Sequence, residues 1–138
     1  MRNWFTKKVE YEGAPLHLRR PDHKNIWTYK DKYIQLICLT HSLNSEKTND
    51  LPTTDYNLSL IDFDEEVVNI LNAENEGIVF LVETYGGTRN YWFYTRPTDE
   101  IILKFNNLKN RHLDKKIEIS SKSDNDWGFI NKYPYKLY

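Results

Sequence analysis

The chain has 138 residues, a formal net charge of −1 and 28% charged residues. This length predicts one domain over residues 1–138 with a substantial core. A charge near zero argues against the basic excess typical of nucleic-acid-binding proteins, so we expect no nucleic-acid partner. No apolar run reaches the roughly 18–20 residues of a membrane span, and the first 13 residues lack a signal-peptide core. We therefore expect a cytoplasmic protein without membrane contact.

Three strands are predicted before residue 44. Asn3–Val9 and Leu16–Arg20 flank the turn-forming residues Gly13-Ala14-Pro15, which predicts an N-terminal β-hairpin. Apolar and polar residues alternate in Leu16–Arg20, as expected for a strand with one exposed face. Tyr33–Leu43 is the third strand.

A polar segment and a helix follow. Asn44–Asp55 contains a proline and no hydrophobic periodicity, and it is predicted to be a mobile loop. Leu60–Ala73 places its apolar residues on one stripe at helical spacing, which predicts an amphipathic helix. Asp62 and Glu65 have the spacing of a capping box at the start of this helix.

The strongest pattern is the segment Gly77–Pro97. An apolar, β-branched run is followed by Gly86-Gly87 and then by an aromatic run, which predicts a central β-hairpin with a two-residue turn. This register pairs Tyr85 with Thr88, Val82 with Tyr91 and Phe80 with Phe93. It places Ile78, Phe80, Val82, Tyr91 and Phe93 on one face and Val79, Leu81, Trp92 and Tyr94 on the other.

The remaining elements complete a recognisable order. Thr98–Leu108 is predicted to be a helix capped by Thr98, and Lys116–Ser120 is predicted to be the last strand. Asp124 is placed to cap a short helix that buries Trp127 and Ile130. The segment from Tyr33 to Ser120 then has the order β-α-β-β-α-β. We expect an α+β fold: a ferredoxin-like antiparallel sheet with helices packed on one face and an extra N-terminal β-hairpin.

Four local signals resemble one family. They are the opening Trp4 with the segment GAPLHLRR, the helix that ends before GIVFLVET, the pattern Thr84-x-x-Gly87-x-Arg89 leading to Phe93-Tyr94, and Asp124-x-Asp126-Trp127. Together they resemble the bacterial domain-of-unknown-function family 695. The resemblance implies an α+β fold. Some chains of that family carry a domain similar to the type-B inhibitory regulator of ribonuclease E, which implies protein binding rather than catalysis.

No pattern of catalytic or cofactor-binding residues stands out. None of the four histidines has a metal-ligand spacing to another histidine, a cysteine or clustered carboxylates, so no metal is expected. Ser42, beside His41, lacks the glycines of a nucleophile elbow. Gly86-Gly87 is not followed by the lysine of a phosphate-binding loop. We expect no cofactor and no enzymatic activity.

Two groups of residues are candidates for binding a partner. Thr84, Tyr85 and Arg89 lie near the tip of the central hairpin, where they form either a contact patch or a simple cross-strand polar pair. The acidic residues lie before and within the first turns of the predicted helix, where they form either a docking face for a basic protein or an ordinary solvated helix start. These acidic candidates are Asp55, Asp62, Asp64, Glu65 and Glu66.

Two functions remain open at this stage. The first is a non-enzymatic inhibitor or immunity protein that neutralises a bacterial toxin, for example a nuclease, by covering its active site. The alternative is a small-ligand-binding or enzymatic domain that uses a cleft beside the sheet, with Arg89 and His41 as polar groups. The sequence does not give the oligomeric state.

Overall fold

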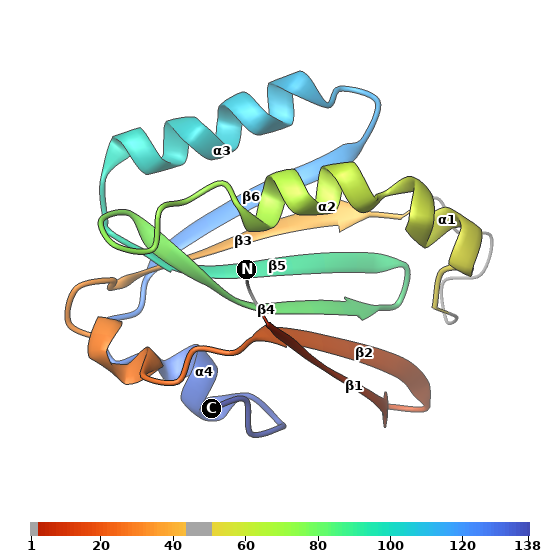
Figure 1. The fold of residues 1–138 in the computed structure, drawn as a ribbon, viewed down its shortest axis with the longest axis horizontal. Coiled ribbons are helices and arrows are strands. Elements are labelled where there is room, and N and C mark those ends of the chain that lie inside the picture. The colour runs from red at the N-terminus through yellow and green to blue at the C-terminus, as the bar shows by residue number, and fades with distance from the viewer. Residues whose placement is uncertain (1–2, 44–50) are drawn as a thin grey trace.

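Six antiparallel strands form one sheet in the order β1-β2-β4-β5-β3-β6 (Figure 1). The structure is a computed structural model that describes residues 3–43 and 51–138. The expected α+β class and antiparallel sheet are confirmed. The strands are β1 (Trp4–Tyr11), β2 (Ala14–Pro21), β3 (Gln35–Ser42), β4 (Gly77–Tyr85), β5 (Thr88–Thr95) and β6 (Lys116–Ser123). The helices are α1 (Thr54–Ser59), α2 (Ile61–Val68), α3 (Asp99–Arg111) and α4 (Gly128–Lys132), with a 3-10 turn over Ile26–Tyr29.

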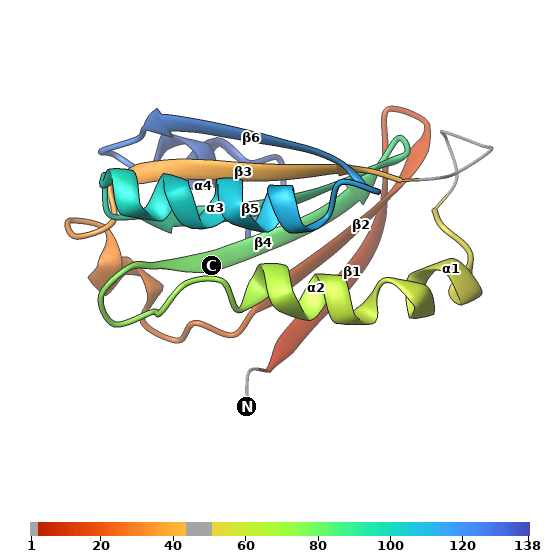
Figure 2. The same ribbon diagram turned by 90° about the horizontal axis from the view of Figure 1, so that it is seen from above.

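Each face of the sheet has its own apolar cluster. Helices α2 and α3 cover one face, where Phe63, Val67 and Phe105 pack against β3, β5 and β6 (Figure 2). Helix α4 lies on the opposite face, where Trp127 and Ile130 pack against β2, β4 and β5. The expectation that helices pack on one face is therefore wrong for α4. Since both faces are covered near β4 and β5, these strands are apolar on both sides.

The central hairpin contains a β-bulge that the sequence pattern did not reveal. Tyr85 pairs with Thr88 and Val82 pairs with Tyr91, as predicted. Beyond the bulge between Val79 and Leu81, Phe93 pairs with Val79 and not with Phe80. Because the extra residue shifts the alternation, Ile78, Phe80 and Leu81 all lie in the α4-side cluster, and Val79 and Val82 lie on the other side. The predicted assignment of Ile78, Phe80 and Val79 to faces is wrong, whereas Leu81 shares a face with Trp92 and Tyr94 as predicted.

The helical connection before β4 begins earlier than predicted and consists of two helices. Helix α1 starts at Thr54, inside the predicted loop 44–55, and Thr53 caps it by accepting from the Tyr56 amide at 3.3 Å. Residues 44–50 of that loop lie outside the described residues. Leu60 occupies the cap position of α2 and no side chain caps this helix, so the expected Asp62–Glu65 capping box is absent. None of the helices in the described ranges is long and apolar enough to cross a membrane.

Side chains replace strand pairing along part of β4. Strand β2 pairs with β4 only between residues His17–Arg19 and Val82–Thr84. Further along β4, the backbone oxygen of Val79 contacts His23 Nε2 at 2.8 Å, and that of Phe80 accepts from the Tyr138 hydroxyl at 3.0 Å. The hydroxyl of Tyr138 also lies 2.8 Å from the oxygen of Pro21. The C-terminal segment therefore satisfies backbone groups at the bulge.

Candidate functional site

A cleft of about 700 Å³ lies between the sheet and helices α1 and α2, and we call it the helix-side cleft. Its floor comes from β2, β4 and β5, and its wall comes from α1 and α2. Polar and charged side chains from both sides face it. The lining residues are Trp4, His17, Arg19, Asn57, Ile61, Asp64, Glu65, Val68, Asn69, Val82, Thr84 and Arg89.

One row of the sheet places several polar residues side by side beneath this cleft. Arg89 of β5 pairs with Thr84 of β4, which pairs with His17 of β2. On the other side, Arg89 pairs with His41 of β3. The row ends at Lys8 of β1, which pairs with His17. Residues that pair across antiparallel strands point to the same face, so these side chains share the face that carries α2.

Arg89 is the most buried charged residue of the cleft, with 9% of its surface exposed. Its Nε donates to Thr84 Oγ1 at 2.9 Å, and its Nη2 donates to Asn57 Oδ1 at 2.8 Å. The predicted neighbourhood of Arg89 and Thr84 is therefore present. Asn57 adds a contact from helix α1 that fixes the guanidinium between the sheet and the helix.

Asp64 on α2 is held by two residues of the sheet. Its Oδ1 accepts from Arg19 Nη2 at 2.6 Å and from the Tyr91 hydroxyl at 2.8 Å. Burial and the negative charge of Asp64 raise the pKa of Tyr91 well above its ordinary value. The Arg19 guanidinium also lies 4.6 Å from the centre of the Trp4 ring. These contacts tie α2 to β1, β2 and β5.

Two histidines of the row have perturbed pKa values. Burial, followed by the charges of Arg19, Arg89 and Lys8, lowers the pKa of His17. Burial and then the charge of Arg89 lower the pKa of His41 to about 4. His41 packs edge-on against Phe63 at 5.1 Å, and its buried Nδ1 has no hydrogen-bond partner within the described part of the chain. Both imidazoles are therefore neutral at neutral pH.

The predicted binding residues do not form one site. Thr84, Arg89, Asp64 and Glu65 line the helix-side cleft. Glu66 points elsewhere and pairs with Arg111 at 2.6 Å and with His112 at 2.7 Å. Asp55 and Asp62 are exposed on α1 and α2. Tyr85 lies on the opposite face, because alternation separates it from Thr84, and its hydroxyl donates to the oxygen of Tyr11 at 3.1 Å.

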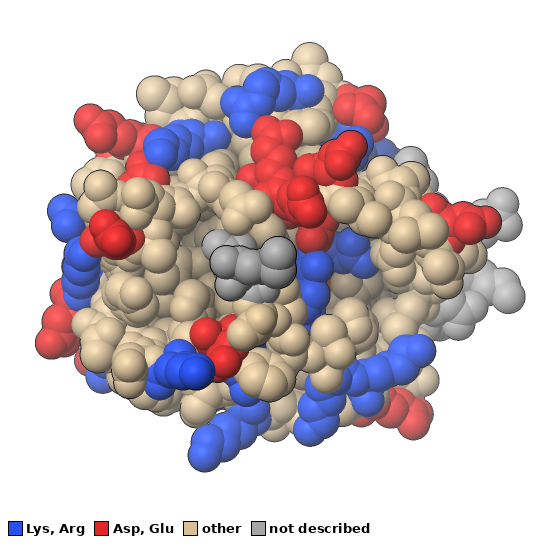
Figure 3. Space-filling model, viewed as in Figure 1, with Lys and Arg blue, Asp and Glu red and all other residues tan. Residues whose placement is uncertain are grey.

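A ridge on α1 and α2 combines exposed apolar and acidic side chains. Leu58 is 59% exposed and Ile61 is 46% exposed, and they are three residues apart. Asp55, Asp62 and Glu65 are exposed on the same two helices. Figure 3 shows acidic side chains gathered on this side of the molecule, over α2. We call these five residues the α1–α2 ridge.

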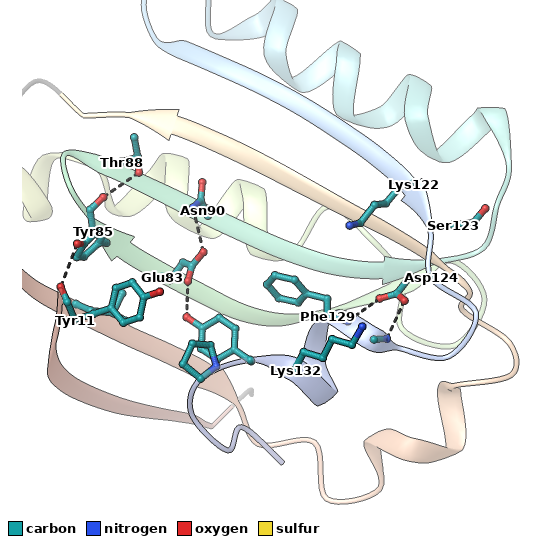
Figure 4. A pocket seen from close by; sticks show the side chains of 14 residues that line it. Tyr11, Glu83, Tyr85, Thr88, Asn90, Lys122, Ser123, Asp124, Phe129 and Lys132 are labelled. Atoms are coloured by element: carbon teal, nitrogen blue, oxygen red, sulfur yellow. Dashed lines mark hydrogen bonds between the residues drawn. The ribbon is translucent and has the colours of Figure 1, made fainter.

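A second cavity of about 580 Å³, the aromatic pocket, lies on the α4 side of the sheet (Figure 4). Tyr11, Tyr85, Phe129 and Tyr133 contribute aromatic rings to its lining. At its base, Glu83 Oε1 accepts from Asn90 at 3.1 Å and from Trp92 at 2.8 Å. Glu83 Oε2 accepts from the Tyr133 hydroxyl. With three donors, this carboxylate is used to hold the pocket together.

Sequence reasoning missed Asn57, His17 and Arg19 as members of the cleft. The alternation in Leu16–Arg20 does place His17 and Arg19 on the face opposite the leucines, and this was the available signal. Which strand lies next to β2 is set by long-range pairing and cannot be read from local pattern. Asn57 was missed because the predicted loop ended at Asp55 and the predicted helix began at Leu60, which left residues 56–59 without a predicted element.

The described residues offer no metal site and no reactive thiol. Residues 3–43 and 51–138 contain no group of three or more His, Cys, Asp or Glu side chains that could hold a metal ion. Cys38 is buried, and burial raises the pKa of its thiol to about 12. The thiolate needed for nucleophilic chemistry is therefore not formed at neutral pH.

Comparison with known proteins identifies a family for nearly the whole chain. Residues 7–135 match the model of a family described as a family of unknown function, DUF695. The chain belongs to this family, which confirms the resemblance seen in the sequence. No curated protein and no solved structure matches the chain.

Proposed function

We propose that this member of the DUF695 family is a non-enzymatic bacterial protein that binds a basic protein in the cytoplasm and inhibits it. The partner class that fits best is a bacterial toxin with a positively charged active site, such as a nuclease. The α1–α2 ridge carries this proposal, because it places two exposed apolar side chains among three acidic ones.

The apolar residues supply the contact area of the proposed interface. Large exposed aliphatic side chains are costly to leave in water, at roughly 25 cal/mol per Å² of apolar area. Leu58 of α1 and Ile61 of α2 are three residues apart in sequence, and both would be buried when a partner covers the ridge. Interface centres are typically apolar with a polar rim.

The acidic residues supply the specificity. In the described residues, Asp55, Asp62 and Glu65 take part in no ion pair, so their charges are free to face a partner. Asp64 and Glu66 are instead engaged by Arg19 and Arg111. A nuclease active site attracts phosphate, and exposed carboxylates at similar positions compete for the same basic residues. Binding there blocks substrate access by steric occlusion.

The proposal includes a finer description of the fold. The strand order β4-β5-β3-β6, with helical connections between β3 and β4 and between β5 and β6, supports a ferredoxin-like unit. The antiparallel pair β1 and β2, joined through Glu12 and Gly13, supports an added N-terminal hairpin beside β4. In this arrangement the ridge lies on the first helical connection.

Co-expression with the product of the neighbouring open reading frame tests this function. The chain and a tagged partner are expressed together, purified through the tag, and compared with the double variant Asp62→Lys, Glu65→Lys. We expect the native chain to co-purify and the double variant to bind at least about tenfold more weakly, which corresponds to 1.4 kcal/mol. The association rate of the native chain should also fall with added salt.

The double variant Asp99→Lys, Glu100→Lys is the matched control. These residues lie in the first turn of α3, on another helix, so the charge change is the same and the location is different. The control should bind like the native chain. A native chain that forms no complex with any neighbouring gene product, or a ridge variant that binds as well as the control, would contradict the proposal.

A further inference from the structure

The charge of Arg89 is not balanced by any carboxylate within residues 3–43 and 51–138. The side chain is nine-tenths buried, and its two hydrogen-bond partners, Thr84 and Asn57, are both neutral. No carboxylate of the described residues lies within ion-pair distance of it. Buried charges in proteins are normally paired, because removing an ion from water without a counter-charge is costly.

The nearby acids do not supply the missing charge. Asp64 and Glu65 line the same cleft. Asp64 is occupied by Arg19 and by the Tyr91 hydroxyl. Glu65 is exposed on α2. The pair Arg19–Asp64 is neutral overall, so the floor of the cleft keeps the positive charge of Arg89.

Unused donors surround this charge. A guanidinium has five N–H groups, and the Nη1 group of Arg89 makes no hydrogen bond within the described ranges. Asn57 accepts from Arg89 through Oδ1, so its amide nitrogen retains its donors. The imidazole of His17, across Thr84 in the same row, also lines the cleft. A planar guanidinium is well suited to carboxylate and phosphate groups.

We propose that the helix-side cleft binds the carboxylate or phosphate group of a small molecule, with Arg89 as its charged ligand and His17 and Asn57 as additional donors. The cleft shares Ile61 and Glu65 with the α1–α2 ridge, but its proposed ligands are other residues, so this proposal does not depend on the proposed function. The cleft volume of about 700 Å³ lies within the usual range of small-molecule sites. A metabolite larger than a bare ion therefore fits.

The electrostatics of His17 fit the same occupant. Without a ligand, burial and the charges of Arg19, Arg89 and Lys8 lower the pKa of His17. The acids that also line the cleft are Asp64 and Glu65. An oxyanion next to Arg89 would offset the positive charges and raise the pKa of His17, which makes this imidazole a reporter of binding.

Titration with two probes tests the proposal. Inorganic phosphate and succinate are added separately at constant ionic strength, maintained with sodium chloride. Two quantities are followed: the melting temperature, and the NMR signals of the Arg89 Nε–H group and the His17 ring. At about ten times the dissociation constant, we expect the melting temperature to rise by roughly 3–6 °C. The Arg89 signal should shift, and the pKa of His17 should increase.

Three variants locate the effect. Arg89→Gln should remove the thermal response to either probe, and His17→Gln should weaken it. Lys109→Gln removes a positive charge from the last turn of α3, outside the cleft, and should respond like the native chain. If Arg89→Gln does not fold, the Arg89 Nε–H shift in the native chain and the His17→Gln titration decide the question.

The results of these titrations answer two questions: whether the site exists, and whether its ligand carries a phosphate or a carboxylate group. A response to phosphate alone supports a phosphorylated ligand, and a response to succinate alone supports a carboxylate. A response to both supports a general oxyanion site. Native Arg89 and His17 signals that shift with neither probe overturn the proposal, as does an equal thermal response in the native chain and in Arg89→Gln.

Discussion

The indole nitrogen of Trp127 donates a hydrogen bond of 2.7 Å to the backbone oxygen of Tyr33, 94 residues earlier in the chain. The indole ring also stacks on Tyr94 at 4.3 Å between ring centres. Asp124 accepts from the amides of Gly128 and Phe129 at 2.8 and 3.1 Å, which confirms its predicted role at the start of α4. Trp127 therefore ties the start of α4 to the residues just before β3 and to β5.

Replacing Trp127 with phenylalanine should reduce stability by about 2–4 kcal/mol, because it removes apolar volume and leaves a buried carbonyl without its donor. Urea unfolding followed by circular dichroism measures this change. The same substitution at Trp27, which is 45% exposed, is the control and should cost less than about 0.5 kcal/mol. Equal losses at both positions would show that the hydrogen bond contributes little.

Changing Asp64 to asparagine should destabilise the protein by about 1–2 kcal/mol. The substitution removes the charge that faces Arg19, and it retains an oxygen for Tyr91. Since Asp62 is exposed and makes no ion pair among the described residues, Asp62→Asn is the matched control and should be nearly neutral. The difference in unfolding free energy should shrink as salt is added, and a salt-independent difference would contradict an electrostatic cause.

The free energy of unfolding should decrease as the pH is lowered, and part of this decrease should come from His41. The folded pKa of His41 is about 4, below the ordinary value of 6.5, so the unfolded chain binds the proton first as the pH falls. The stabilisation that His41 contributes to the folded state is complete above the pKa of His41 in the unfolded chain. It is lost as the pH decreases toward the pKa of His41 in the folded chain.

Between pH 7 and about pH 4.5, the native chain should lose about 2–3 kcal/mol more stability than His41→Leu. Urea unfolding at the two pH values measures both proteins. His17 titrates in the same direction in both chains, so its contribution cancels in the comparison. Identical pH dependence in the two proteins would mean that His41 is protonated equally in the folded and unfolded states.

Gly77 should not tolerate a side chain. An added Cβ would lie 2.6 Å from the backbone oxygen of Tyr94 and 2.9 Å from the Cα of Thr95, and neither atom can move independently of strand β5. We expect Gly77→Ala to cost about 2 kcal/mol or more, measured as a lower melting temperature. At Gly13, where φ is +82° and no atom lies within 4 Å, alanine should cost only about 1 kcal/mol of backbone strain.

The local sequence pattern predicted most of the helices and strands. Most differences between the predicted and the observed structure arise from long-range contacts. Periodicity located β4, β5 and α3, and the glycine pair fixed the register at the hairpin tip, where Tyr85 pairs with Thr88. The bulge beside Phe80 was not predictable, because an apolar run buried on both faces gives no alternation to reveal an extra residue. The start of α1 was missed because its residues are polar.

The candidate site was predicted only in part for the same reason. The pairing of Arg89 with Thr84 follows from the hairpin register alone, and it was predicted. The neighbours that complete the cleft come from β2 and α1, which are far away in sequence. The acidic residues were grouped by sequence proximity, but helical geometry separates them, so that Asp64 and Glu66 pair with Arg19 and Arg111 on different sides of α2.

The contact between Tyr138 and the bulge has a consequence for handling the protein. The hydroxyl of this residue bonds the carbonyl oxygens of both Pro21 and Phe80. The Pro21 oxygen also accepts from the His23 amide at 3.1 Å. Phe80 lies on the stretch of β4 that β2 does not reach, so loss of the Tyr138 hydroxyl would remove the donor that the Phe80 oxygen has there. Exposed strand edges of this kind recruit other strands. We therefore expect the variant Tyr138→Phe to self-associate more readily on storage than the native chain.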